Sequence, residues 1–390
     1  METQNQTSFK RLQSLDALRG FDMFWIAGGG AIFAGLASLT GWGPLVWWNK
    51  QMLHVEWHGF AFQDMIFPLF LFIAGISFPF SMAKRIENGA SLNWLYKQIF
   101  KRGIILVLLG LIYNDLLSFA FIKTGSNSET GILSFEFSNM RFASVLGRIG
   151  LAWMFAALIF INTNKRNTRI AWCAGLLIFY WLLLALVPAF DNSGAGRFSM
   201  EGNFTSYFDR MFLPGKLYKD IHDPEGWLGI IPATATALLG MFTGWFLMWR
   251  KEGLTELRRT GYMAIAGIVL IVAGLLWSII FPINKNLWTS SFVCFVGGLS
   301  LLLFALFYLI IDVWGYRKWS FFFTVIGMNS ITIYMAQRMI RFSYTSNFLF
   351  KGIIDWFPEP WMPFLSSCAY LAVSWIFLYF LYRQKIFLKV

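Results

Sequence analysis

The sequence predicts an all-α, polytopic integral membrane protein, and three observations support this fold class. Hydrophobic residues make up 57% of the 390 residues and charged residues only 13%, and the mean hydropathy is +0.58. A soluble domain has roughly 25% charged residues, so the deficit indicates an apolar solvent. Apolar runs recur along the whole chain without a long polar stretch, which predicts a single transmembrane domain over residues 1–390.

The apolar runs predict about ten membrane-spanning helices, because each span needs about 20 mostly apolar residues. The sixth to eighth runs are the clearest, and the ninth is weakened by Asn329, Arg338 and Arg341. The expected spans lie near 15–39, 61–83, 99–121, 144–162, 169–189, 227–248, 261–282, 289–312, 319–342 and 363–382.

Basic residues concentrate in alternate loops of this ten-helix arrangement. If ten helices are counted, every one of these basic segments falls on the same side of the membrane. The positive-inside rule makes that side the cytoplasm and places both termini there. The basic residues are Lys10, Arg11, Lys84, Arg85, Lys97, Lys101, Arg102, Lys165, Arg166, Arg169, Arg250, Lys251, Arg258, Arg259, Arg317, Lys318, Arg383, Lys385 and Lys389.

The formal charge of +12 suggests nucleic-acid binding in a soluble protein. In a membrane protein, Lys and Arg orient helices and meet anionic lipid headgroups, so no nucleic-acid partner is expected. Cys173, Cys294 and Cys368 all lie within apolar runs. Their spacing fits neither a metal site nor a disulfide framework, and they are interpreted as packing residues.

The segment from His54 to Asp64 holds two of the three histidines, at the expected outer end of the second span. Histidine is the side chain best suited to proton exchange near neutral pH. Ten residues of straight helix would separate His54 from Asp64 by about 15 Å, so the two pair only if the chain folds back, which Gly59 permits. The alternative is that His54 and His58 are interfacial residues with amphipathic rings.

Further polar residues lie in or beside expected spans, where they are costly unless they have a role. Arg19 either forms an ion pair with Asp16 or binds the phosphates of a nucleotide substrate. Arg148 either pairs with a carboxylate or binds substrate. Asp223 and Glu225 either cap a helix or bind substrate. Asn329 and Ser330 either pack between helices or line a substrate channel.

Two glycine-rich segments, Gly28-Gly29-Gly30 and Gly240-x3-Gly244, form small-residue surfaces within expected spans. Close packing of helices is the first explanation for both. A contact between two copies of the chain, giving a homodimer, or space for a narrow ligand is the second.

Five motifs, in this order along nearly the whole chain, resemble those of the heparan-alpha-glucosaminide N-acetyltransferase family. Each motif alone is weak, but together they are specific. They are Ser14-Leu-Asp16-Ala-Leu-Arg19-Gly20, His54-x-x-Trp57-x-Gly59-x4-Asp64-x-x-Phe67-Pro68, Val145-Leu-Gly-Arg148-Ile-Gly150, Asp223-Pro-Glu225-Gly226 and Gly327-Met-Asn329-Ser330-Ile331.

The resemblance implies transfer of an acetyl group from cytosolic acetyl-CoA to the amine of a glucosamine-like sugar on the far side. His54 and Asp64 would be catalytic, and Arg19, Asn329 and Ser330 would bind acetyl-CoA. Substrate binding would fall to His58, Arg148, Asp223 and Glu225. His54 would act as a general base or would carry the acetyl group covalently; no metal takes part in either route.

The eukaryotic members of the family have a luminal domain and a further span before this core, and a polar Asn before the glycine run. This chain has Ile26-Ala27 before Gly28 and is expected to be a member without the luminal domain, in a bacterial inner membrane. Two other functions stay open. One is a transporter for an amino sugar that uses the same pocket, and the other is an O-acyltransferase for an envelope glycan.

Overall fold

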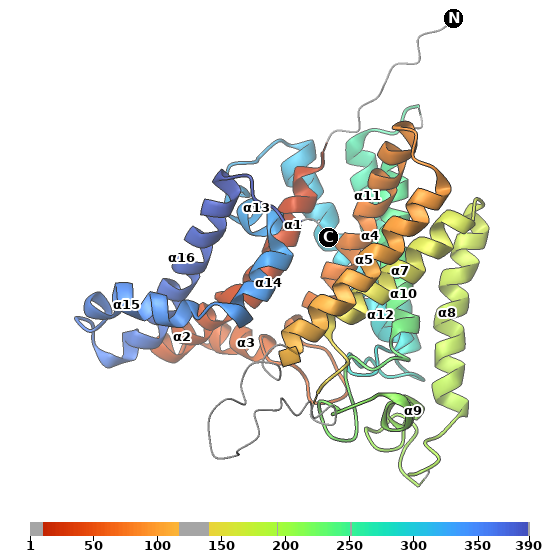
Figure 1. Ribbon diagram of the computed structural model, residues 1–390, viewed down its shortest axis with the longest axis horizontal. Coiled ribbons are helices and arrows are strands. Elements are labelled where there is room, and N and C mark those ends of the chain that lie inside the picture. Colours follow the sequence, from red (N-terminus) through yellow and green to blue (C-terminus); the bar gives the residue numbers. More distant parts are fainter. Residues whose placement is uncertain (1–10, 117–139, 193, 250–251, 389–390) are drawn as a thin grey trace, which may run out of the picture.

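The computed structural model describes residues 11–116, 140–192, 194–249 and 252–388, which are mostly helical and include no β-strand. Figure 1 shows long helices running side by side between two ends of the molecule. The helical elements are α1 Gln13–Phe24, η1 Trp25–Gly29, α2 Gly30–Thr40, α3 Gly43–Gln51, α4 Phe62–Glu87, α5 Leu92–Leu111, η2 Ile112–Leu116, α7 Val145–Asn162, α8 Arg166–Leu186, α9 Phe204–Phe212, α10 Ile230–Met248, α11 Glu256–Trp277, α12 Ser290–Tyr308, η4 Leu309–Val313, α13 Phe321–Met328, α14 Ser330–Met339, α15 Phe342–Ile354, η5 Glu359–Trp361 and α16 Met362–Arg383.

Eight helical segments within the described part of the chain are long and apolar enough to cross a membrane. Each coincides with one of the ten expected spans. The prediction of an all-α, polytopic membrane protein is therefore confirmed. The eight segments are Gln13–Thr40, Phe62–Glu87, Val145–Asn162, Arg166–Leu186, Ile230–Met248, Glu256–Trp277, Ser290–Val313 and Glu359–Arg383.

The other two expected spans differ from a continuous apolar helix. Helix α5 has Lys97, Lys101 and Arg102 before or near its middle, and residues 117–121 of that expected span lie outside the described residues. The ninth span is divided at Asn329, whose φ of −127° and ψ of 34° separate α13 from α14. The count of ten therefore stays a prediction.

Helices α4 and α10 form the centre of the larger bundle. In α4, 72% of the most apolar window is buried, compared with 22% in α11, which faces outward. The core around α4 includes Phe72, Leu238 and Phe304. A second core, with Met23, Val325 and Leu378, joins α1, α13 and α16, which Figure 1 shows at the opposite edge from α8.

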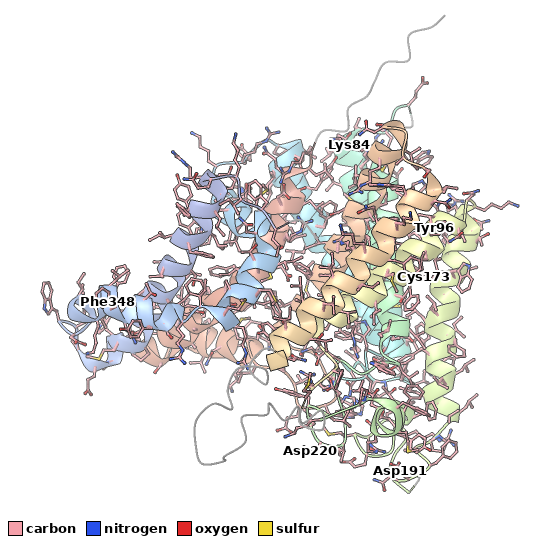
Figure 2. The ribbon with its side chains drawn as sticks, viewed as in Figure 1. Lys84, Tyr96, Cys173, Asp191, Asp220 and Phe348 are labelled. Atoms are coloured by element: carbon pink, nitrogen blue, oxygen red, sulfur yellow. The ribbon has the colours of Figure 1, made fainter. Side chains whose placement is uncertain are left out.

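The two ends of the molecule differ in charge. Figure 2 shows Lys84 at one end and Asp191 and Asp220 at the other. The second end bears the segment 187–229, which includes α9, and Figure 1 shows α9 below the long helices. We call residues 187–229 the cap. The alternation of charge agrees with the expected topology, but the side on which the termini lie stays a prediction.

The cap rests on the loop between α3 and α4. Trp57 Nε1 donates to the carbonyl oxygen of Phe198 at 2.6 Å, and its ring meets the edge of the His222 ring at a centroid distance of 5.1 Å. Ser206 Oγ lies 2.8 Å from His222 Nδ1. Burial lowers the pKa of His222 to about 3, so this histidine is a neutral structural group.

The close approach of α4 and α10 depends on glycine, as the small-residue pattern predicts. A Cβ atom on Gly240 would overlap the Phe72 carbonyl oxygen, and one on Gly75 would overlap that of Ala237. We expect Gly240→Ala to lower stability by about 1–3 kcal/mol, because the helices must separate. The measurement is the midpoint of thermal unfolding in detergent.

Gly175→Ala is the matched control, because a Cβ at that position of α8 meets no atom within 4 Å. Alanine favours helix over glycine by up to about 1 kcal/mol, so the control should be neutral or slightly stabilising. Equal effects of the two substitutions would contradict close packing at Gly240.

Candidate active site

The loop between α3 and α4 folds back at Gly59 and brings His54 onto Asp64. Gly59 has a φ of 119°, which glycine adopts readily, and its N–H donates to the carbonyl oxygen of Ile283 at 2.9 Å. His54 Nδ1 lies 2.7 Å from Asp64 Oδ1. The fold-back that the sequence requires for this pair is therefore present.

Asp64 is in the first turn of α4 and uses both carboxylate oxygens. Oδ2 accepts the N–H of Ala61 at 3.0 Å, which caps the helix, while Oδ1 faces His54. The Asp64 side chain is 0% exposed, whereas that of His54 is 53% exposed. A helix N-terminus favours a negative charge. The buried carboxylate can thus hold the Nδ1 proton and leave Nε2 of an accessible imidazole free for chemistry.

Lys285, in the short connection between α11 and α12, reaches the same imidazole. Its Nζ lies 3.1 Å from His54 Nδ1 and 3.3 Å from Nε2, and 3.8 Å from Asp64 Oδ1. Burial lowers the pKa of Lys285, while Glu225 and Asp64 oppose that effect. His54 therefore lies between a buried carboxylate and a largely buried amine.

We call residues 282–289 the Lys285 loop, and several hydrogen bonds attach it to the loop between α3 and α4. Asn284 Nδ2 lies 3.3 Å from His58 Nδ1, and Asn286 Nδ2 donates to the Glu56 carbonyl oxygen at 3.2 Å. Burial lowers the pKa of His58. The partner of His58 is thus the side-chain amide of Asn284, on the same loop as Lys285.

Arg141, Asp223 and Glu225 form a second charged cluster near the site, in which Arg141 pairs with both acidic residues. Asp223 accepts two hydrogen bonds from Arg141, at 2.8 and 2.6 Å, and Glu225 also pairs with Arg141. Burial raises the pKa of Asp223, but the bonds and charge of Arg141 outweigh burial and keep the pKa below its usual value. Both carboxylates thus already have a strong partner, and their role toward substrate stays a prediction.

Arg148 is a buried cation just inside α7. Its side chain is fixed by a hydrogen bond to the Gly226 carbonyl oxygen at 2.7 Å, and it lies over the Trp288 ring at 5.3 Å. Nε and one terminal nitrogen have no hydrogen-bond partner among the described residues. Those unused donors are compatible with the predicted substrate contact, which stays a prediction.

The predicted acetyl-CoA residues lie on other elements, and within the described part of the chain none of them is hydrogen-bonded to His54 or Asp64. Arg19 donates to Ser77 Oγ at 3.0 Å and lies 3.4 Å from Asp16, so the ion pair expected at this position is present. Asn329 is buried at the break between α13 and α14, where its Oδ1 accepts from Thr332 at 3.3 Å. Ser330 is buried beside it.

Lys285 and Arg141 are functional candidates that the motifs did not indicate. One signal was available for Lys285: it is a basic residue in a short loop that the ten-helix count places outside, against the positive-inside rule. The same signal applies to Arg141, which is a basic residue in another expected outer loop. The signal is not specific, because the expected outer loops also hold Lys50, Arg210 and Lys351. Arg141 and Lys285 differ from these in having carboxylate partners that are buried in the candidate site.

Comparison with known proteins agrees with the five motifs. The human heparan-alpha-glucosaminide N-acetyltransferase is 26% identical over 436 aligned residues, which cover 97% of this chain. The mouse protein of the same name is 25% identical over 99% of the chain. This chain is therefore similar to the heparan-alpha-glucosaminide N-acetyltransferases over nearly its whole length. The resemblance predicted from the motifs is confirmed.

The relatives are longer than this chain, which spans 60% of the length of the human protein and 61% of the mouse protein. A family model described as a domain of unknown function (DUF5009) matches residues 11–137. That match covers the first motif and the segment with His54 and Asp64. The Lys285 loop and the Asp223 motif lie outside the residues that this family model matches.

Asp209 in α9 makes stability depend on pH. Burial raises its pKa from 3.8 to about 7, although Trp227 N–H and Arg148 favour its charged form. A folded-state pKa above the unfolded value means that the contribution to stability is fully present below about pH 4. It is lost as the pH rises through about 7. We therefore expect the unfolding temperature to fall between pH 5 and pH 8, and to fall less in Asp209→Asn.

Asparagine keeps the acceptor for Trp227 N–H, which Asp209 Oδ1 binds at 3.1 Å. Asp220→Asn is the control, because its side chain is 84% exposed. Thermal unfolding of all three proteins at both pH values tests the assignment. An identical pH dependence in wild type and Asp209→Asn would refute it.

Proposed function

We propose that this protein is a transmembrane acetyltransferase that moves the acetyl group of cytosolic acetyl-CoA to an amino sugar on the other side of the membrane. The main support is the pair of His54 and the fully buried Asp64, held at 2.7 Å at the end of the bundle that bears the cap. The whole-chain similarity to N-acetyltransferases is independent support.

The chemistry requires an unprotonated nitrogen that faces the reacting atoms. With the Nδ1 proton on the Asp64 side, His54 Nε2 can take the proton of the acceptor amine as it attacks the thioester carbonyl. In the second route Nε2 attacks first, the carbon–sulfur bond breaks, and the thiolate of CoA leaves. The acceptor amine then takes the acetyl group from the imidazole. Both routes use the same atom and the same carboxylate.

A row of polar and basic residues at the expected cytoplasmic end supports binding of the CoA phosphates. It begins on α4 with Ser77, Ser81 and Arg85, which are four residues apart and therefore share one face of the helix. Arg85 Nε donates to Ser81 at 3.2 Å. The donors of a guanidinium group match the geometry of phosphate and carboxylate oxygens, and CoA carries phosphate groups.

Two further guanidinium groups extend this row. Arg19 donates to Ser77, and Arg102 of α5 lies 4.1 Å over the Trp153 ring. Arg19 and Arg85 both act electrostatically on Arg102, and among the described residues Arg102 forms no ion pair. Three cations with one nearby carboxylate, Asp16, favour an anionic ligand at this end.

Loss of the imidazole should abolish turnover. We expect His54→Ala to reduce the rate of CoA release by at least about 10²-fold, and Asp64→Asn to give an intermediate rate, because the ring loses its orientation. Purified protein in detergent, acetyl-CoA and glucosamine are used, and both CoA and acetylated sugar are measured. Leu53→Ala is the control, since this neighbour is 63% exposed.

Two results would refute the proposed function. One is full CoA release by His54→Ala. The other is uptake of glucosamine by vesicles that contain the wild-type protein, without consumption of acetyl-CoA, which would indicate a transporter.

Loss of Arg102 should weaken binding of the donor alone. We expect Arg102→Ala to raise the KM for acetyl-CoA by about tenfold, because a charge-assisted contact with phosphate is lost, and to leave the KM for glucosamine unchanged. Acetyl-pantetheine, which lacks the nucleotide, should be used equally well by wild type and variant. Lys101→Ala, an exposed neighbour on α5, is the control. Equal loss with both donors would contradict a phosphate contact.

A further inference from the structure

The Lys285 amine is held against the reactive imidazole by its own loop. Trp288 N–H donates to the Lys285 carbonyl oxygen at 3.0 Å, and Thr289 N–H donates to that of Asn284 at 3.1 Å. Trp288 is 1% exposed, and its indole N–H donates to Thr236 at 3.2 Å. A buried tryptophan therefore fixes the turn that presents the lysine.

The lysine side chain is itself largely buried, with 13% of its surface exposed. Its Nζ lies 3.1 and 3.3 Å from the two ring nitrogens of His54, so it is within reach of both. An ammonium group in this position borders the space next to Nε2, where a thioester carbonyl would be attacked under the proposed function.

We propose that Lys285 is a third catalytic residue, whose ammonium group stabilises the negative oxygen that forms when the thioester carbonyl is attacked. This inference rests on the proposed function. Attack by His54 Nε2 or by the acceptor amine forms a carbon–nitrogen bond and moves the carbonyl electron pair onto oxygen. Lys285 donates a hydrogen bond to that oxygen. When the electron pair returns, the carbon–sulfur bond breaks, CoA leaves as the thiolate, and Lys285 keeps its proton.

The same ammonium group has a second effect on His54. A neighbouring positive charge disfavours a second one, so Lys285 opposes protonation of the imidazole, while Asp64 favours it. Among the described residues, the charged groups in contact with His54 are the Asp64 carboxylate and the Lys285 amine, and Glu225 acts on the lysine from the cap side.

Three variants of Lys285 test the assignment. We expect Lys285→Met to reduce kcat by about 10²–10³-fold, the usual effect of removing one oxyanion donor, with the KM for acetyl-CoA changed less than about threefold. Lys285→Gln keeps a hydrogen-bond donor but no charge, so its kcat should lie between that of Lys285→Met and that of Lys285→Arg. Lys216→Met, a change at a lysine that is 61% exposed, should have the activity of wild type. A kcat of Lys285→Met within twofold of wild type overturns the proposal.

A readout that does not depend on activity distinguishes this inference from the proposed function. The chain has three histidines, so their ring signals can be assigned by NMR of the ¹³C-histidine protein with His58→Ala and His54→Ala as references. In Lys285→Met the His54 signal should titrate at higher pH than in wild type, and the acidic limb of the rate profile should move with it. No movement of the titration overturns the inference.

If wild type has no activity but the titration moves, the proposed function fails while the contact between Lys285 and His54 stands. If wild type is active and Lys285→Met unfolds, the comparison of Lys285→Arg with Lys285→Gln decides. Rates that are equal in these two variants overturn the proposal, since only arginine retains a cation.

Discussion

The candidate site depends on the carboxylate of Asp64, which makes two separate interactions. Asp64 caps the first turn of α4 through one oxygen and holds His54 through the other. Helix α4 is also the central helix of the larger core, and its buried residues run from Asp64 to Pro79, so packing fixes the capped end. The imidazole is thereby positioned by a buried helix, although it belongs to a loop.

The Lys285 loop forms the other side of the site. It is hydrogen-bonded to the loop between α3 and α4, so each loop restrains the other. Gly59, Glu56 and His58 each meet a different residue of the Lys285 loop. Tyr180 of α8 donates to the Leu287 carbonyl oxygen at 2.6 Å from behind. A network with several hydrogen bonds restricts the positions that the two side chains can adopt, which favours catalysis by orientation.

Sequence patterns predicted the features that depend on local composition. Hydropathy located the eight helices that the structure confirms, and Gly59 indicated how His54 could return to Asp64. The ninth span was uncertain from the start because of Asn329, and the chain does break there.

Contacts between distant loops could not be predicted in this way. Lys285 meets His54 across 231 residues, and Arg141 meets Asp223 across 82, and no periodicity encodes such pairings. The basic charge of these residues on the expected outer side was the only local sign of them. Lys50 and Lys351 give the same sign in other expected outer loops, so charge alone does not identify the residues of the site.

The charges around His54 explain how a buried ionic site can accept an amine. Arg141, Arg148 and Lys285 face Asp64, Asp223 and Glu225, so the formal charges of these side chains cancel. An isolated buried charge would be costly, and a net negative site would instead hold an amino sugar as its ammonium form, which cannot attack a thioester. A balanced cluster avoids both problems. Under the proposed function, the acceptor would be held by hydrogen bonds, and its proton would be removed at His54 rather than retained by the field of the site.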